Sequence, residues 1–168
     1  EDALQSLGYF MTRGYNRPRR IAPGVTLTFK DAGHMLGSAI IILDIEDHDD
    51  NRAKRLVFSG DLGREGIPII RDPEMLEGAD ILIMESTYGN RLHESYEESE
   101  KKLEHIVVET HKRGGSIVMP AFAVGRTQQL VLSLHQLSER GDIPHIPIYV
   151  DSPLAVNATS VFQLHPEC

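Results

Sequence analysis

The chain has 168 residues, which is enough for one ordinary globular domain or for two small lobes. Its hydrophobic fraction of 40% and charged fraction of 25% are typical of a folded chain and exclude collagen-like, low-complexity and wholly disordered sequences. The net charge of −8 argues against a nucleic acid held by bulk positive charge, so any such partner needs a local binding site.

The only cysteine, Cys168, is the last residue, which excludes an intrachain disulfide and a cysteine-rich zinc module. This usage is typical of a reducing compartment, so we expect a cytoplasmic protein. No stretch approaches the roughly 20 apolar residues of a membrane-spanning helix, so we expect no membrane partner. The chain begins at Glu1 without an initiator methionine or a signal-peptide pattern, as a piece of a longer protein would.

The first half of the chain carries the pattern of an antiparallel sheet. Runs of β-branched and alternating residues at 25–29, 39–45 and 56–61 predict three strands of a meander, and the polar segment 46–55 predicts a charged hairpin loop. Residues 73–78 predict one helical turn. The apolar run 80–85 predicts a strand covered on both faces.

The second half alternates between helical and strand patterns. Ser95 stands three residues before Glu98, a capping box that predicts a helix running to the glycines at 114 and 115. Further helices are predicted at 124–137 and 154–164, and buried strands at 116–119 and 146–150. This alternation predicts right-handed crossovers and a parallel sheet, and hence an α/β fold.

Three polar residues stand at ends of predicted strands, beside glycines or small residues: His34, Asp61 and Glu85. Strand ends hold side chains rigidly while turns leave them accessible, which favours a functional role. Taken singly, each also fits a structural role, as a turn residue or as a cap for backbone amides. Zinc accepts His and Asp but needs three or four protein ligands, so His34 and Asp61 can supply only part of a zinc site.

Five motifs occur along the chain in the order Asp31–Ala39, Phe58–Gly63, Glu85–Gly89, Pro120–Arg126 and Tyr149–Pro153. They resemble the β-CASP group of metallo-β-lactamase-fold nucleases, and within it the RNA-processing branch that contains the cleavage-and-polyadenylation endonuclease. The resemblance implies that residues 1–90 are the C-terminal portion of a metallo-β-lactamase αββα sandwich and that 91–168 are the N-terminal portion of a parallel-sheet β-CASP cap. The family's four-ligand histidine motif would lie upstream and its last two histidine motifs downstream.

The resemblance also implies roles for single residues. His34 would be a zinc ligand, Asp61 the carboxylate that bridges two Zn²⁺ ions, and Glu85 an acid that orients a catalytic histidine from elsewhere in the protein. The implied activity is two-metal hydrolysis of phosphodiester bonds in single-stranded RNA, with this chain alone inactive. Arg126 is a candidate substrate-binding residue, although its stem could instead pack on the helix while its head caps a carbonyl. Phe122 is predicted to be a core residue.

Alternative functions follow from the same resemblance. The family includes non-catalytic scaffold subunits that have lost ligands, but this chain retains all three acidic or histidine positions. DNA-directed members of the Artemis type usually have Cys-Pro where this chain has Met35-Leu36, and Asp-Phe where it has Asp61-Leu62. Hydrolysis of a small substrate is disfavoured because the Glu85 and Pro120–Arg126 motifs belong to the nuclease cap. The resemblance also allows a homodimer of the complete protein.

Overall fold

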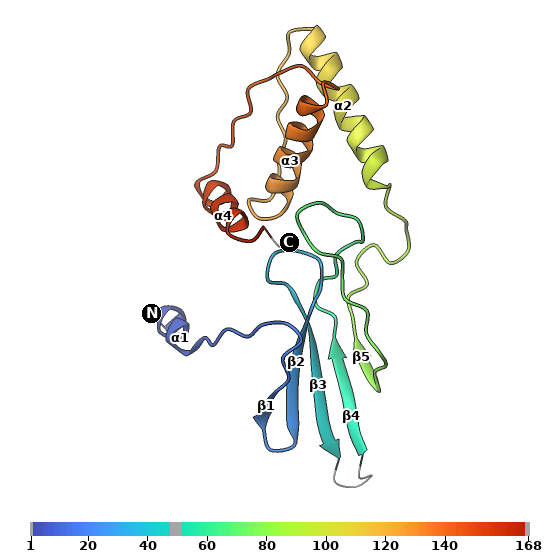
Figure 1. Cartoon of the computed structure of the whole chain (residues 1–168), viewed down its shortest axis with the longest axis vertical. Coiled ribbons are helices and arrows are strands. Elements are labelled where there is room, and N and C mark those ends of the chain that lie inside the picture. Colours follow the sequence, from blue (N-terminus) through green and yellow to red (C-terminus); the bar gives the residue numbers. More distant parts are fainter. Residues whose placement is uncertain (1, 48–51, 167–168) are drawn as a thin grey trace. The chain divides into compact units, whose positions relative to one another are not determined.

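The computed structural model describes residues 2–47 and 52–166, and the mixed α/β class predicted from the sequence is confirmed (Figure 1). The chain forms two compact units. The first consists of Glu1–Gly63 and Asp72–Glu85, and the second of Arg64–Arg71 and Ser86–Cys168. The assignment of 1–90 and 91–168 to two family lobes stays a prediction. None of the helices among the described residues is long and apolar enough to span a membrane.

The first unit is built on a five-stranded sheet in which neighbouring strands follow the order β1-β2-β3-β4-β5. The first four strands pair antiparallel, which confirms the predicted meander, and β5 pairs parallel with β4. The tip of the predicted hairpin loop, residues 48–51, lies outside the described residues. The elements of this unit are α1 Asp2–Ser6, the 3-10 helix η1 Leu7–Tyr9, β1 Arg19–Ala22, β2 Val25–Asp31, β3 Ala39–Asp47, β4 Arg52–Phe58 and β5 Ile81–Ile83.

One face of this sheet forms the core of the first unit. Ile40 and Ile42 are 2% and 5% exposed, whereas Ile41 between them is 36% exposed, because successive side chains of a strand point to opposite faces. They pack with Ala32 and Val57. The prediction of a fully covered strand at 80–85 is wrong: β5 is about half exposed, because β4 is the only described element with extensive contacts to it.

The predicted helical turn at 73–78 is also absent, and its backbone has no regular structure. Instead, the Glu74 amide donates to the Asp31 carbonyl oxygen (3.0 Å), and the Asp31 amide donates to a carboxylate oxygen of Glu74 (3.0 Å). These two bonds hold the segment against the end of β2. The segment is thus held by bonds to a distant strand and not by bonds within a helical turn, so the prediction of a helical turn is wrong.

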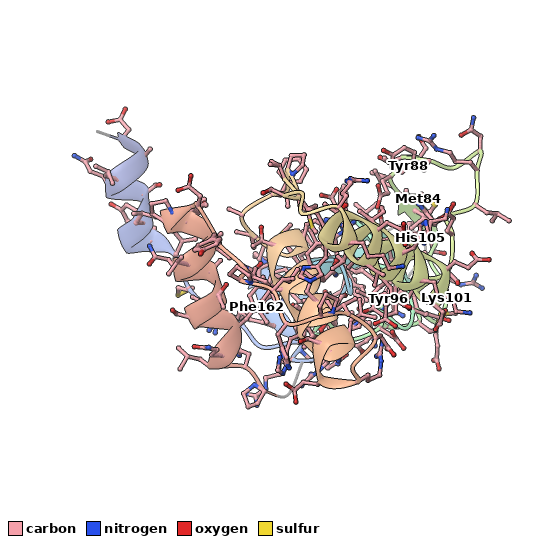
Figure 2. All side chains as sticks on the ribbon, turned by 90° about the horizontal axis from the view of Figure 1, so that it is seen from above. Met84, Tyr88, Tyr96, Lys101, His105 and Phe162 are labelled. Carbon is pink, nitrogen blue, oxygen red and sulfur yellow. The ribbon has the colours of Figure 1, made fainter. Side chains whose placement is uncertain are left out.

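The second unit contains three helices, α2 Tyr96–Lys112, α3 Arg126–Glu139 and α4 Pro153–Gln163, all predicted from the sequence. The capping box of α2 is confirmed, since Ser95 accepts from the Glu98 amide and Glu98 accepts from the Ser95 amide, each at 3.1 Å. Figure 2 shows Tyr96 on α2, and its hydroxyl lies 2.8 Å from the Ser133 hydroxyl of α3. The core of this unit combines α2, α3 and the residues after α3: Val107, Leu134, Leu137 and Ile143.

The predicted strands at 116–119 and 146–150 are wrong, since the described part of the second unit contains no strand. A strand requires a backbone partner, and neither segment has one among the described residues. Both segments instead line a cavity of about 590 Å³ within this unit. The prediction that Phe122 is a core residue is wrong as well, because its side chain is 86% exposed.

Candidate functional site

Strand direction brings the predicted residues of the first unit to one edge of the sheet. The end of β2 pairs with the start of β3 at Asp31 and Ala39, so the segment that carries His34 connects them at that edge (Figure 1). At the same edge Phe58, the last residue of β4, pairs with Ile41 of β3 and with Ile83, the last residue of β5. Antiparallel pairing of β3 with β4, and parallel pairing of β4 with β5, therefore place the segments after β2, β4 and β5 together.

The His34 and Asp61 segments touch through their glycines. The Gly63 amide donates to the Ala32 carbonyl oxygen at 2.8 Å. A Cβ atom on Gly63 would lie 1.5 Å from the carbonyl oxygen of Gly33, a separation that no pair of non-bonded atoms tolerates. Only glycine at position 63 therefore lets the two backbones approach this closely.

The segment that carries His34 is closed by its own polar groups. The Asp31 carboxylate accepts from the Gly33 amide at 2.9 Å, and the Ser38 hydroxyl oxygen accepts from the amides of His34 and Met35, each at 3.2 Å. The Tyr15 hydroxyl donates to the Ser38 carbonyl oxygen at 2.7 Å. The backbone is thus fixed, while the His34 side chain is exposed and makes no hydrogen bond or ion pair within the described chain.

The carboxylate of Asp61 is placed in a similar way. It is exposed and has no hydrogen-bond or ion-pair partner among residues 2–47 and 52–166. The preceding Ser59 is 4% exposed, and its amide donates to the Ile83 carbonyl oxygen at 2.9 Å. The Asp61 segment therefore starts from a buried, hydrogen-bonded anchor and ends in an accessible acid.

Glu85 is directed at the Asp61 segment. One oxygen of its half-buried carboxylate accepts from the Leu62 amide at 2.6 Å, and its own amide donates to the Ser59 hydroxyl oxygen at 3.2 Å. The Ser59 hydroxyl donates in turn to the Gly60 carbonyl oxygen at 2.7 Å. The role implied for Glu85 by the resemblance, orienting a histidine, stays a prediction.

Glu74 fixes the same edge from the side of β2. Its carboxylate accepts from the Asp31 amide, from the Asn16 side-chain amide and from the Lys30 ammonium group, each at 3.0 Å. Burial by itself would raise the pKa of the Glu74 carboxyl, but these three donors oppose it and leave the pKa below its ordinary value. Sequence analysis did not single out Glu74, because its partners lie 43 to 58 residues away in the chain.

The donor set at the edge fits part of a zinc site. Imidazole nitrogen and carboxylate oxygen are zinc ligands, and both side chains are accessible on adjoining, well-anchored segments. Among the described residues, however, no group of three His, Cys, Asp or Glu side chains could hold a metal ion. His34 and Asp61 would therefore supply only two ligands, fewer than a zinc site needs.

Arg126 belongs to the second unit, whereas His34, Asp61 and Glu85 belong to the first. It is the first residue of α3, and its exposed side chain has no hydrogen-bond or ion-pair partner within the described residues. The alternative that its head caps a carbonyl is thus not what the structure shows. The buried Gln128 side chain accepts from the Gly125 amide at 2.7 Å and so supports the turn that precedes Arg126.

A second group in this unit was missed by sequence analysis. The guanidinium carbon of Arg91 lies 4.0 Å from the centre of the Tyr88 ring, and the His93 ring meets Tyr88 edge-on with centroids 5.2 Å apart. Tyr88 has a φ of +56°, which is rare for an aromatic residue. The Tyr-Gly-Asn-Arg-Leu-His sequence, with its aromatic and cationic residues separated by a turn, was the available signal.

Comparison with known proteins agrees with these motifs. Residues 127–168 match the Beta-Casp domain family. The chain is 34% identical over 162 residues to a ribonuclease of Thermus thermophilus, covering 96% of this chain and 36% of that protein. It is 36% identical over 167 residues to the transcription termination factor FttA of Methanosarcina mazei, covering 97% of this chain and 25% of that protein. The C-terminal part of the chain is thus similar to the Beta-Casp domain family, and nearly the whole chain is similar to these two proteins.

A third relative matches most of the chain as well. The chain is 36% identical over 144 residues to cleavage and polyadenylation specificity factor subunit 3-I of Arabidopsis thaliana, covering 84% of this chain and 20% of that protein. The chain thus spans between a fifth and about a third of the length of these relatives. The predicted resemblance to the RNA-processing branch is confirmed, and the matched stretch includes both units described above.

Proposed function

We propose that this chain is the central part of a β-CASP nuclease that hydrolyses phosphodiester bonds in RNA. The observation that carries the proposal is the meeting of the His34 and Asp61 segments at one sheet edge, with both side chains exposed and unpaired among the described residues. If the histidine and the aspartate served only to close turns, their side chains would form hydrogen bonds with nearby backbone amides. Names of similar proteins, among them a ribonuclease and a polyadenylation factor subunit, favour RNA as the substrate.

In the proposed site, His34 and Asp61 hold zinc together with ligands from elsewhere in the protein. Bound zinc would supply Lewis-acid activation of a water molecule near neutral pH and stabilisation of charge on the phosphate. Asp61 would contribute a carboxylate oxygen as a ligand. His34 contributes a neutral imidazole nitrogen, which requires that its other ring nitrogen carry the proton. Arg126 is the proposed contact to an RNA phosphate.

Substitution of the two proposed ligands tests this function. In the complete protein, His34→Ala and Asp61→Ala should each abolish cleavage of single-stranded RNA while leaving the unfolding transition unchanged, because a two-metal site fails when either ligand is lost. His105→Ala is the matched control, since His105 is exposed on α2 and should leave cleavage intact. Undiminished cleavage in either ligand variant would contradict the proposal. Cleavage of a DNA strand of the same sequence but not of RNA would favour the DNA-directed alternative.

A further inference from the structure

We propose that Glu85 is a positioning residue for the Asp61 segment, and that its carboxylate sets the direction in which Asp61 presents its own carboxylate. The zinc part of this inference rests on the proposed function, whereas the positioning part stands on the geometry of the first unit alone. Residue types at 61 and 85 do not reveal this link, because a strand-end acid can equally cap the amides that follow it. In the structure the Glu85 carboxylate instead accepts from the Leu62 amide, 23 residues earlier in the chain.

The hydrogen bond that carries the proposal is short, and it joins the Glu85 carboxylate to the peptide unit between Asp61 and Leu62. Oε1 of Glu85 lies 2.6 Å from the Leu62 amide nitrogen. Hydrogen bonds to an ionised acceptor are roughly twice as strong as neutral ones. Because the peptide unit is planar, holding the Leu62 N–H also fixes the Asp61 carbonyl and thereby the backbone torsion of Asp61.

A second bond runs in the opposite direction between the same two segments. The main chain of Glu85 donates to the Ser59 hydroxyl oxygen, while the side chain of Glu85 accepts from the Leu62 main chain. Asp61 lies between these two tethers, and the Gly63 amide is bound to Ala32 just beyond them. The backbone on both sides of Asp61 is therefore held, although its side chain has no partner among the described residues.

This role differs from the orientation of a catalytic histidine, and one substitution separates the two. Within the described residues, the second carboxylate oxygen of Glu85 has no hydrogen-bond partner and remains available for another donor. Glu85→Gln retains an oxygen that accepts from the Leu62 amide but removes the negative charge. Glu85→Ala removes the acceptor altogether. The positioning role predicts that Gln substitutes for Glu and that Ala does not.

Amide hydrogen exchange of the chain measures the tether directly. Exchange at the Leu62 amide should become about tenfold faster in Glu85→Ala and stay within about threefold in Glu85→Gln. The matched control is Glu98→Ala, which removes the same type of bond from the Ser95 amide in the second unit. It should accelerate exchange at Ser95 and leave Leu62 unchanged. Unchanged exchange at Leu62 in Glu85→Ala would overturn the positioning role.

Zinc affinity of the complete protein measures the consequence. Equilibrium titration with Zn²⁺ should show binding about 10- to 100-fold weaker for Glu85→Ala and near wild type for Glu85→Gln. Wild-type zinc affinity in Glu85→Ala would overturn the zinc part of the proposal even if Leu62 exchanges faster. If Glu85→Ala does not fold, Ser59→Ala tests the second tether and should accelerate exchange at Glu85 and weaken zinc binding. A wild-type protein that cleaves no RNA would refute the proposed function but not the tether.

Discussion

At the residue scale, Glu74 shows how one carboxylate anchors a functional edge from outside it. Its three donors come from two parts of the first unit: the Asn16 side chain before β1, and the Lys30 side chain together with the Asp31 backbone amide at the end of β2. The Lys30 and Glu74 side chains are 27% and 30% exposed, so the ion pair is partly shielded from solvent. Folding therefore favours the charged form of the Glu74 carboxyl group.

The lowered pKa of Glu74 gives a signed prediction for stability. A carboxyl whose folded pKa is lowered stabilises the protein above its unfolded pKa of about 4.3, and this contribution is lost as the pH falls through the folded pKa. Glu74→Gln should therefore lower the unfolding free energy by about 1–2 kcal/mol at pH 7, and the difference should shrink below about pH 4. Urea denaturation at both pH values measures it.

The matched control is Glu46→Gln, because Glu46 is an exposed carboxylate of the same unit. Its unfolding free energy should stay within about 0.5 kcal/mol of wild type at both pH values. A Glu74→Gln variant that lost the same stability at low and at neutral pH would show that packing, not charge, is responsible.

Single residues were predictable where the strand pattern marks their position. His34, Asp61 and Glu85 follow recognisable apolar runs, and strand ends are where accessible side chains are held. Their partners were not predictable, because the Leu62, Ser59 and Ala32 contacts depend on which strands become neighbours. Phe122 was predicted wrongly for a related reason: an aromatic residue indicates burial only when a neighbouring element covers it.

At the element scale, an element was predicted correctly when the residues that determine it lie within its own segment of the sequence. The helices contain capping residues and apolar stripes within one segment, so α2, α3 and α4 were found. Strands need partners, so the apolar runs at 116–119 and 146–150 predicted a sheet that the described chain does not form. β1 was missed because its arginine-rich sequence has no apolar alternation, and its four residues are exposed.

The contact between the β2–β3 and β4–β5 connections predicts a specific intolerance. Gly63→Ala should force the two segments apart, because its Cβ would overlap the Gly33 carbonyl. We expect a loss of about 1–3 kcal/mol in unfolding free energy and weaker zinc binding in the complete protein. Gly8→Ala is the control, since a Cβ on Gly8 would meet no atom within 4 Å. Unfolding by urea and titration with Zn²⁺ measure the two effects, and wild-type values for both would contradict the close approach.

At the scale of the whole molecule, the order of motifs indicated the resemblance that the comparisons support, although the chain spans only a fifth to about a third of the compared relatives. Motif order survives in a piece of a protein, because each motif is local. A metal site does not, because its ligands come from distant parts of the chain and must all be present. The sequence can therefore suggest two ligands of the proposed zinc site without containing all the ligands that such a site needs.

This difference predicts that the 168-residue chain by itself binds zinc weakly and cleaves no RNA. Two ligands leave most of the coordination sphere to water, and among the described residues no third His, Cys, Asp or Glu joins them. Metal analysis after dialysis of the chain against Zn²⁺-free buffer should find far less than one zinc per chain. His34→Ala, which removes a proposed ligand, should leave that content unchanged. Two tightly held zinc ions per chain would refute the prediction and would require ligands at positions other than those proposed.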